Sequence, residues 1–386
     1  MSVETISLGC RLNFAETETI ARSAPAGEDW IVVNSCAVTN EAARQTRQAI
    51  RRAHRQRPSA KILVTGCAAE LEPTTFATMP GVSCVVGNTN KINSFAANDV
   101  MAPAGLLANV KSFVAVQTGC DHRCTFCSIW QARGPSVSLP FEAIRDAIAR
   151  EIDRGAKEIV LTGVDITDYR GGLGVLCQRL LAAEPRLNRL RLSSLDSIEI
   201  DGALFELIAG ESRLMPHFHL SLQAGDDMIL KRMKRRHSRT DAVRTVERIK
   251  AARPDASIGA DLIAGFPTET EEMALNSLKL LNDCDIVAAH VFPFSARRMT
   301  PAARMPQLPR DLVKARAARL REGAAARRMR WLDSLVGSVQ PILVEGEGTG
   351  HTDNFAPVAI AGVHRGESGK TRISGRDGDR LRAIWA

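Results

Sequence analysis

The feature that most constrains this chain is a short loop with three cysteines. Within QTGCDHRCTFCSIWQARG, Cys120, Cys124 and Cys127 follow a CxxxCxxC spacing, so one short loop presents three thiolates to a single centre. A structural zinc site closes its shell with four ligands, whereas three cysteines on a 4Fe-4S cluster leave one iron open to another ligand. The loop therefore predicts a soft-metal centre with an open position where chemistry can occur.

Length and composition set the frame for this loop. A chain of 386 residues exceeds one ordinary core, which favours two or three domains. No apolar run reaches the length of a membrane span and the start of the chain lacks a signal peptide, so we expect a cytoplasmic protein. In that reducing compartment, nine cysteines indicate metal or catalytic use rather than a disulfide framework. A net charge of +8 favours a polyanionic partner.

A second set of cysteines is found in the first hundred residues, where the pattern is typical of an open parallel α/β sheet. The expected strands are 5–8, 30–33, 62–65 and 84–86, and the first three run directly into Cys10, Cys36 and Cys67. The carboxyl ends of parallel strands meet at one edge of a sheet, so these thiols are expected to converge on a second metal site. The alternative is that each is a small buried hydrophobic residue at a strand end.

A basic helix is expected between the second and third of these strands, in EAARQTRQAIRRAHRQRP, and it ends at Pro58. Arg44, Arg47, Arg51 and Arg55 are three or four residues apart and share one face, a stripe that suits the phosphates of RNA. A solvated outer face explains the same spacing equally well. Residues 98–111 have the composition of a linker.

From residue 112 to about 294 the pattern repeats strand then helix six times, which predicts a partly closed parallel (β/α)6 barrel. The expected strands are 113–117, 158–162, 190–193, 218–223, 257–263 and 287–292. Polar residues fall at or near their carboxyl ends, where such barrels carry out chemistry. Beyond the cysteine loop, these candidates are Gly163, Asp165, Ser194, Gln223 and Asp261. Each alone is more often a cap or turn residue.

The last part of the chain predicts a connecting helix and a small β-barrel. Residues 310–331 form an arginine-rich helix, and short strands at 339–345, 355–361, 370–374 and 381–385 are separated by Gly-rich turns. Small barrels of this kind often hold RNA. The predicted domains are 1–100, 112–331 and 335–386. Cys84, Cys177 and Cys284 match no ligand spacing and are expected in the core.

At this point the residues support a resemblance. CDHRCTFC, with the downstream TGVD and a six-unit barrel, resembles the radical S-adenosylmethionine superfamily. The strand-end cysteines before it and the β-barrel after it are similar to the methylthiotransferase family over essentially the whole chain. VNSCAVTNEAARQTRQAIRR, LTGVDIT, RLSSLDSIEID, HLSLQAGDDMILKRMKRRHS and GADLIAGFPTETEE are similar to the branch that acts on threonylcarbamoyladenosine beside the tRNA anticodon, at position 37.

The resemblance implies roles for the candidate residues. Cys120, Cys124 and Cys127 would hold a 4Fe-4S cluster whose open iron binds S-adenosylmethionine, and the strand-end cysteines an auxiliary 4Fe-4S cluster that carries the sulfur to be donated. One S-adenosylmethionine would methylate that sulfur and a second would give the radical that starts its insertion at the adenine 2-carbon. Gly163, Asp165 and the other strand-end polar residues would line the pocket.

The expected partners are the tRNA anticodon stem-loop, an electron donor and a sulfur donor, and a monomer is expected. One departure from the family lies after Cys127, where SIWQARG replaces a segment with Pro-Tyr before the final Arg133 and Gly134. Two alternatives stay open: the same chemistry on isopentenyladenosine in tRNA or on a ribosomal-protein aspartate, and a non-enzymatic RNA-binding protein with structural zinc.

Overall fold

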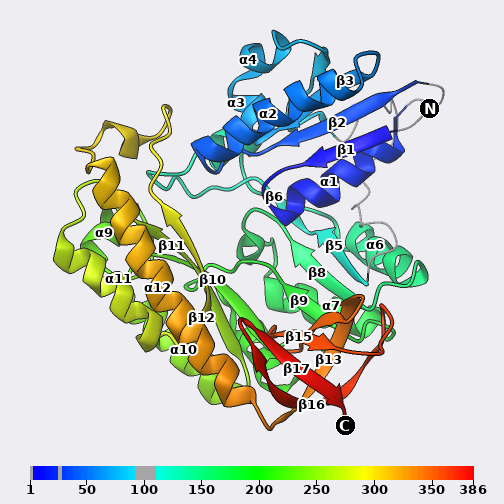
Figure 1. Ribbon diagram of the computed structural model, residues 1–386, viewed down its shortest axis with the longest axis vertical. Coiled ribbons are helices and arrows are strands. Elements are labelled where there is room, and N and C mark those ends of the chain that lie inside the picture. Colours follow the sequence, from blue (N-terminus) through cyan, green and yellow to red (C-terminus); the bar gives the residue numbers. More distant parts are fainter. Residues whose placement is uncertain (1–2, 25–27, 92–109) are drawn as a thin grey trace.

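The computed structural model describes residues 3–24, 28–91 and 110–386, and its strands form three separate groups along the molecule (Figure 1). The N-terminal sheet lies at one end, the central strands lie in the middle, and the C-terminal barrel lies at the other end. Within these ranges no helix is long and apolar enough to cross a membrane. Most of the predicted linker, 98–109, lies outside the described residues.

The N-terminal group is a four-stranded parallel sheet in the order β1-β2-β3-β4, as expected for an open α/β layer. Its elements are β1 (Val3–Ser7), α1 (Arg11–Arg22), β2 (Trp30–Ser35), α2 (Asn40–Gln56), β3 (Lys61–Gly66), α3 (Cys67–Leu71), α4 (Pro73–Ala77) and β4 (Val82–Val85). Thr39 caps α2 by accepting a hydrogen bond from the Ala42 N–H, and the helix ends just before Pro58, where the sequence predicted its end.

The central group contains all six predicted parallel strands in two half-barrels. One sheet has the order β5-β8-β9 and the other β10-β11-β12, and isolated parallel bridges at Leu190–Leu214 and Leu195–Leu220 join them. The strands are β5 (Lys111–Ala115), β8 (Glu158–Thr162), β9 (Leu190–Leu192), β10 (His217–Gln223), β11 (Ser257–Ala264) and β12 (Ile286–Pro293). The result is the open partial barrel expected from the sequence.

Helices and short elements connect the central strands and cover the outside of the barrel. They are β6 (Gln117–Thr118), α5 (Ile129–Arg133), β7 (Val137–Ser138), α6 (Phe141–Asp153), η2 (Ile166–Asp168), α7 (Leu173–Ala183), α8 (Gly202–Gly210), α9 (Asp227–Arg232), α10 (Arg239–Ala252), α11 (Glu271–Asp283) and η3 (Pro301–Arg304).

Alternation along the central strands separates an apolar outer face from a polar concave face. Val114, Leu161 and Leu220 belong to the large core under the helices, together with the buried Cys177 and Cys284. Because neighbouring side chains of a strand point to opposite faces, the polar residues between the core residues face the inside of the barrel. The concave face is therefore free to carry charge and function.

The C-terminal group is a closed five-stranded barrel that follows the long helix α12 (Arg310–Leu335). Its strands are β13 (Val339–Gly346), β14 (Thr349–Thr352), β15 (Pro357–Ile360), β16 (Ser368–Asp377) and β17 (Arg380–Trp385). The sequence predicted the barrel but missed β14, whose TGHT sequence has little strand character. It also began β15 too early, because Phe355 lies in a turn with a φ of 73°.

A turn of the C-terminal barrel covers the amino ends of the central strands. The Phe355 ring stacks on His217, the first residue of β10, with ring centroids 4.9 Å apart. The cations of Lys111 and Arg191 each lie 4.8 Å from the Phe355 ring centre, and Arg189 pairs with Asp353. The amino ends of the barrel are thus closed, and the carboxyl ends remain available for a site.

Candidate active site

The CxxxCxxC loop lies at the carboxyl ends of the central strands and is fixed by backbone contacts. The Cys120 N–H donates to the Gly134 carbonyl at 3.1 Å, and the Thr125 N–H donates to the Met233 carbonyl at 3.0 Å. Burial and the nearby Asp165 carboxylate raise the pKa of Cys120 to about 12, and burial with the Cys124 charge raises that of Cys127 to about 11. The three thiols are therefore neighbours, and a metal centre would have to displace their protons.

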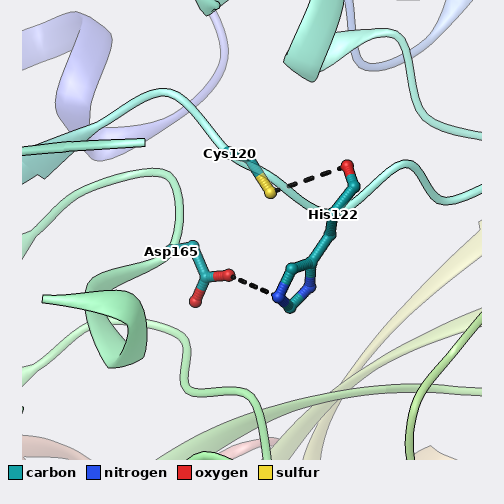
Figure 2. A group of neighbouring side chains, drawn as sticks. All are labelled: Cys120, His122 and Asp165. Carbon is teal, nitrogen blue, oxygen red and sulfur yellow. Dashed lines mark hydrogen bonds and ion pairs between the residues drawn. The ribbon is translucent and has the colours of Figure 1, made fainter. Parts of the chain in front are cut away.

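Three carboxylates surround His122, a histidine of this loop, and Figure 2 shows Asp165 below Cys120 with its carboxylate pointing to the His122 ring. His122 Nε2 lies 3.5 Å from Asp165 Oδ2 and 3.4 Å from Glu199 Oε1, and its Nδ1 lies 3.7 Å from Asp196 Oδ2. The hydrogen bond to Glu199 raises the pKa of His122. This acidic group suits a positively charged ligand next to the cysteine loop.

The segment from Gly163 to Asp165 is shaped by Gln117. Gln117 Oε1 accepts hydrogen bonds from the Val164 N–H at 3.1 Å and the Asp165 N–H at 2.9 Å. A Cβ at Gly163 would lie 2.8 Å from the Gln117 carbonyl oxygen, so the close approach requires glycine. Gly163 and Gln117 thus hold this segment in a shape that directs Asp165 toward the cysteine loop.

The other three cysteines meet at the carboxyl edge of the N-terminal sheet, as the strand alignment predicted. Cys10 precedes α1, Cys36 directly follows β2, and Cys67 begins α3 after β3. A Cβ built at Gly9 would lie 2.4 Å from Cys36 Sγ, which places that sulfur against the strand end before Cys10. Burial, together with charges on Cys10 and Cys67, raises the pKa of Cys36 to about 11. One compact three-thiol site results.

A buried arginine from the central domain reaches into this N-terminal site. Arg133 Nε donates to Cys67 Sγ at 3.3 Å, its Nη1 and Nη2 donate to the two Glu16 carboxylate oxygens at 2.8 and 2.9 Å, and Nη2 also donates to Asn13 Oδ1 at 2.7 Å. Lys91 pairs with the same Glu16. Burial alone would raise the pKa of Glu16, but Arg133 and Lys91 outweigh it and hold the pKa at about 2.

The CxxxCxxC site has a matching arginine of its own. Arg235 Nη1 donates to Cys124 Sγ at 3.7 Å, and its Nη2 donates to Asp196 Oδ2 at 2.8 Å and to the Ser221 carbonyl at 2.9 Å. The Arg133 and Arg235 side chains are only 2% and 6% exposed. Neither contact could be predicted from local sequence patterns, since both join residues that are distant in the chain.

The two cysteine sites face each other closely enough to interact. A charge on Cys67 raises the pKa of Cys127, and Arg297, on the loop after β12, interacts electrostatically with both Cys36 and Cys127. Arg297 Nη1 donates to Asn40 Oδ1 at 2.6 Å, and the Asn40 amide donates to the Ala296 carbonyl at 3.0 Å. This loop therefore joins the N-terminal domain to the barrel beside both sites.

The donors around these sites fit bound groups that offer sulfur or oxygen acceptors. Three buried arginine nitrogens have no hydrogen-bond acceptor within the described part of the chain: Arg235 Nε, Arg297 Nε and Arg297 Nη2. Buried N–H groups almost always find a partner, and cluster sulfides or a ligand carboxylate would supply one. Three thiols in each set, with no disulfide among the described residues, suit two 4Fe-4S clusters with one open iron each.

Comparisons with known proteins agree with this arrangement. Residues 114–281 match the model of the radical SAM superfamily, and residues 2–87 match the model described as uncharacterized protein family UPF0004. A threonylcarbamoyladenosine tRNA methylthiotransferase MtaB from Rickettsia prowazekii is 42% identical, with 92% of this chain and 91% of the relative covered. The chain belongs to the radical S-adenosylmethionine methylthiotransferase family.

Other relatives and a solved structure extend the comparison. MtaB from Thermotoga maritima is 31% identical over 96% of this methylthiotransferase and 94% of the relative. A tRNA-2-methylthio-N(6)-dimethylallyladenosine synthase from Erythrobacter litoralis is 32% identical over 89% and 86%. The radical S-adenosylmethionine methyltransferase TsrM from Kitasatospora setae has a TM-score of 0.55 at 14% identity, covering 74% of this chain and 66% of that one, which supports the fold.

Not all the predicted pocket residues of this methylthiotransferase lie together. Ser194 follows β9 at the carboxyl edge, and Gln223 ends β10 with a φ of 66°. Asp261 instead lies within β11, below the edge, where its Oδ1 is 3.0 Å from His219 Nε2 and 3.1 Å from His290 Nδ1. Asp165 is therefore beside the cysteine loop and Asp261 belongs to a different layer. The cofactor-binding roles of all five candidates stay predictions.

The structure also divides the predicted arginine stripe on α2. Arg44 makes two hydrogen bonds to Glu41, at 2.7 and 2.5 Å, and Arg47 lies 3.9 Å from Glu72. Arg51 and Arg55 instead line an open groove of about 820 Å³ between α2 and the edge strand β1, together with Arg52, Gln45 and Gln48. The second half of the stripe is thus the better candidate for phosphate contacts.

Proposed function

We propose that this protein is a tRNA methylthiotransferase that converts threonylcarbamoyladenosine at position 37, next to the anticodon, to its 2-methylthio derivative. The observation that carries the proposal is the pair of three-cysteine sites on facing edges of two domains. The printed activity of the MtaB relatives, including the one at 42% identity, supports the choice of base.

The six cysteines are the proposed cluster ligands. Cys120, Cys124 and Cys127 hold one 4Fe-4S cluster, and the strand-end set Cys10, Cys36 and Cys67 holds the other. When bound, these clusters and S-adenosylmethionine supply a carbon radical and the sulfur atom to be transferred. Two open sites account for a radical at one and a sulfur to be inserted at the other, which one site alone does not.

The residues around the CxxxCxxC loop position the cofactor. Asp165, directed by Gly163 and Gln117, presents a carboxylate to the amino group of S-adenosylmethionine, and the further charge of Glu199 and Asp196 favours its sulfonium cation. Ser194 and Gln223 complete the rim at the neighbouring strand ends. Asp261 lies deeper and faces the substrate.

The RNA approaches from the side shared by both cysteine edges. The target base must leave its stack to reach them, and positive charge supplies much of the affinity for the surrounding anticodon stem-loop. Arg51 and Arg55 in the α2 groove and the C-terminal barrel are the proposed contacts with the RNA backbone. An electron donor and a sulfur donor complete the reaction, and the protein acts as a cytoplasmic monomer.

Mass spectrometry of tRNA nucleosides from a deletion strain tests the proposal. Loss of 2-methylthio-threonylcarbamoyladenosine, restored by the wild-type gene but not by one encoding Cys36→Ala, is the expected result. Persistence of that nucleoside with loss of the isopentenyl derivative, or with loss of a modified ribosomal-protein aspartate, would replace the substrate. Zinc without sulfide in anaerobically purified protein would remove the enzymatic assignment altogether.

A further inference from the structure

We propose that His290, held by Asp261 and His219 on the concave face of the central barrel, binds the carboxylate of the threonylcarbamoyl group. This inference rests on the proposed function and deepens it, because it names the residues that read the modification already present on the substrate base.

The three side chains share the concave face. In β12, Ala289 and Val291 pack against the large core, so His290 between them points to the opposite side. In β11, Ala260 and Leu262 belong to the same core, which places Asp261 on the concave side beside His290, its partner in the strand register. His219 joins them from β10, with its ring centre 4.6 Å from that of His290.

Asp261 fixes the histidine rings and leaves one nitrogen for a ligand. Asp261 Oδ1 lies 3.0 Å from His219 Nε2 and 3.1 Å from His290 Nδ1. The exposed side-chain fractions of His219, Asp261 and His290 are 11%, 23% and 63%, so the group runs from the interior to an open rim. His290 Nε2 has no partner within the described ranges and faces the solvent-accessible side.

The layer beneath this group is closed, and its charged groups pair mostly with one another. Arg191 Nε donates to Glu158 Oε1 at 2.8 Å, Lys111 lies 2.6 Å from Glu345 Oε1, and Phe355 closes the floor. His217 is buried there, and burial and the charge of Arg191 hold its pKa well below its usual value. The layer with His290 is therefore the deepest one on this face that combines polar groups with access for a ligand.

The depth of the group fits a substituent of the base. Asp261 and His290 lie three residues before the ends of β11 and β12, which is ~10 Å below the carboxyl edge at about 3.3 Å per residue. A base whose reacting carbon lies at the mouth can extend its N6 substituent down this face. Asp261 is thus on the substrate side rather than at the cofactor.

The chemistry favours a carboxylate over an apolar group. His290 can donate through Nδ1 to Asp261 and through Nε2 to the substrate carboxylate, hydrogen bonds that the charge of each carboxylate strengthens. An isopentenyl group at the same place would cover the imidazole and Asp261 without offering them a hydrogen-bond partner, which is unfavourable. The group therefore discriminates between the two modified adenosines through a penalty as well as an attraction.

Equilibrium binding to anticodon stem-loop RNAs tests the inference with the iron-loaded protein. The RNAs carry threonylcarbamoyladenosine, its methyl ester, isopentenyladenosine or plain adenosine at position 37. We expect wild type to prefer the free acid to the ester, and His290→Leu to lose about tenfold in affinity for the free acid and most of that preference. The affinities of wild type and His290→Leu for plain adenosine RNA should agree within about twofold. The affinity of His290→Gln for the free-acid RNA should lie between those of wild type and His290→Leu. Lys279→Leu, at an exposed residue of α11 that lies in no proposed RNA or cofactor contact, is the control and should keep the preference.

Several results would overturn the inference. These are an equal affinity of wild type for acid and ester, an unchanged preference in His290→Leu, or an equal loss for all four RNAs. A divalent metal found in wild type and absent from His290→Gln would make the group a metal site instead. Failure of the proposed function is separate: wild type would then bind the free-acid RNA without converting it to the methylthio product, whatever the His290 variants do.

Discussion

The two cysteine sites have the same number of thiols but opposite surroundings. At the N-terminal site, Cys67 accepts a hydrogen bond from Arg133, and Lys91 adds a second cation to the single carboxylate of Glu16. At the CxxxCxxC site, Arg235 and Arg236 are outnumbered by the three carboxylates that surround His122. Net charge and hydrogen bonds to sulfur set the potential of an iron-sulfur cluster, so equal ligand sets can serve different tasks.

The difference suits the group that we propose for each site. S-adenosylmethionine carries positive charge, and the acidic group lies where such a ligand would approach the open iron of the CxxxCxxC site. The N-terminal site would hold an anionic sulfur, for which a buried cation is the suitable neighbour. The fold supplies both environments at the carboxyl ends of parallel strands, although the two domains are built from different sheets.

Removing one cysteine from each set should separate the two sites most strongly. Cys124→Ala and Cys36→Ala are each expected to lower the iron content from about eight to about four per chain, because each set holds one cluster. Cleavage of S-adenosylmethionine should be lost in the first variant and kept in the second. Iron and sulfide analysis with product assays makes the measurement, and Cys84→Ala, outside both sets, should keep all the iron. A single variant that loses all eight irons contradicts two independent sites.

The acidic group around His122 should affect only the binding of S-adenosylmethionine. Asp165→Asn is expected to weaken the binding of S-adenosylmethionine about 10- to 100-fold, since a charged hydrogen-bond partner is lost. Asp168→Asn, three residues further along the same loop, is the matched control and should bind normally. Equilibrium dialysis of the iron-loaded protein measures the affinity. Equal behaviour of the two variants would argue against a role for Asp165 in binding.

The two arginines should tune different clusters. Arg133→Lys keeps the charge but loses the fixed N–H on Cys67, so the reduction potential of the N-terminal cluster should become more negative while the other stays constant. Arg235→Lys should make the potential of the CxxxCxxC cluster more negative and leave that of the N-terminal cluster constant. Redox titration followed by electron paramagnetic resonance resolves the two signals. A shift of both signals in either variant would mean that the surroundings are not separate.

A third buried charge group should affect neither site. Burial would raise the pKa of Glu158, but Arg191 and Lys111 outweigh it and hold the pKa well below the usual 4.5. The stabilisation it provides is therefore fully present above about pH 4.5 and declines as the pH falls further. Glu158→Gln should lower the free energy of unfolding by about 3 kcal/mol at pH 7 and flatten its dependence at acid pH.

Urea titrations of wild type and Glu158→Gln between about pH 7 and about pH 4 measure this effect. Both cluster potentials should stay at their wild-type values in the variant at neutral pH. A changed potential would show that the closed end of the barrel communicates with the cysteines at its mouth.

The sequence predicted the parts of the molecule that depend on local patterns. The strands before Cys10, Cys36 and Cys67 were evident because apolar runs end at those residues, and parallel pairing then placed the three thiols together. Family membership and the fold class are confirmed by the comparisons. The spacing of the α2 arginines, in contrast, did not reveal that Arg44 and Arg47 face acidic partners of their own.

The contacts between domains were beyond sequence reasoning. Arg133 and Glu16 are 117 residues apart, and nothing in either segment marks them as partners. The same holds for the group on the concave face, because His219, Asp261 and His290 come from three different strands. Asp261 was noticed only as a polar residue late in a strand, and its neighbours became visible once the register of β10, β11 and β12 was known.

The contact of Phe355 sets the distance between the C-terminal barrel and the edge that carries the cysteines. Its ring fastens the C-terminal barrel to the amino ends of strands that are mostly five to eight residues long, so ~16–26 Å of strand separates that barrel from the carboxyl edge with the cysteines. An RNA that contacts both ends must present a folded stem of matching span, and a free nucleoside reaches only one. With the proposed RNA contacts, the fold selects its substrate by size and shape as well as by the chemistry of one base.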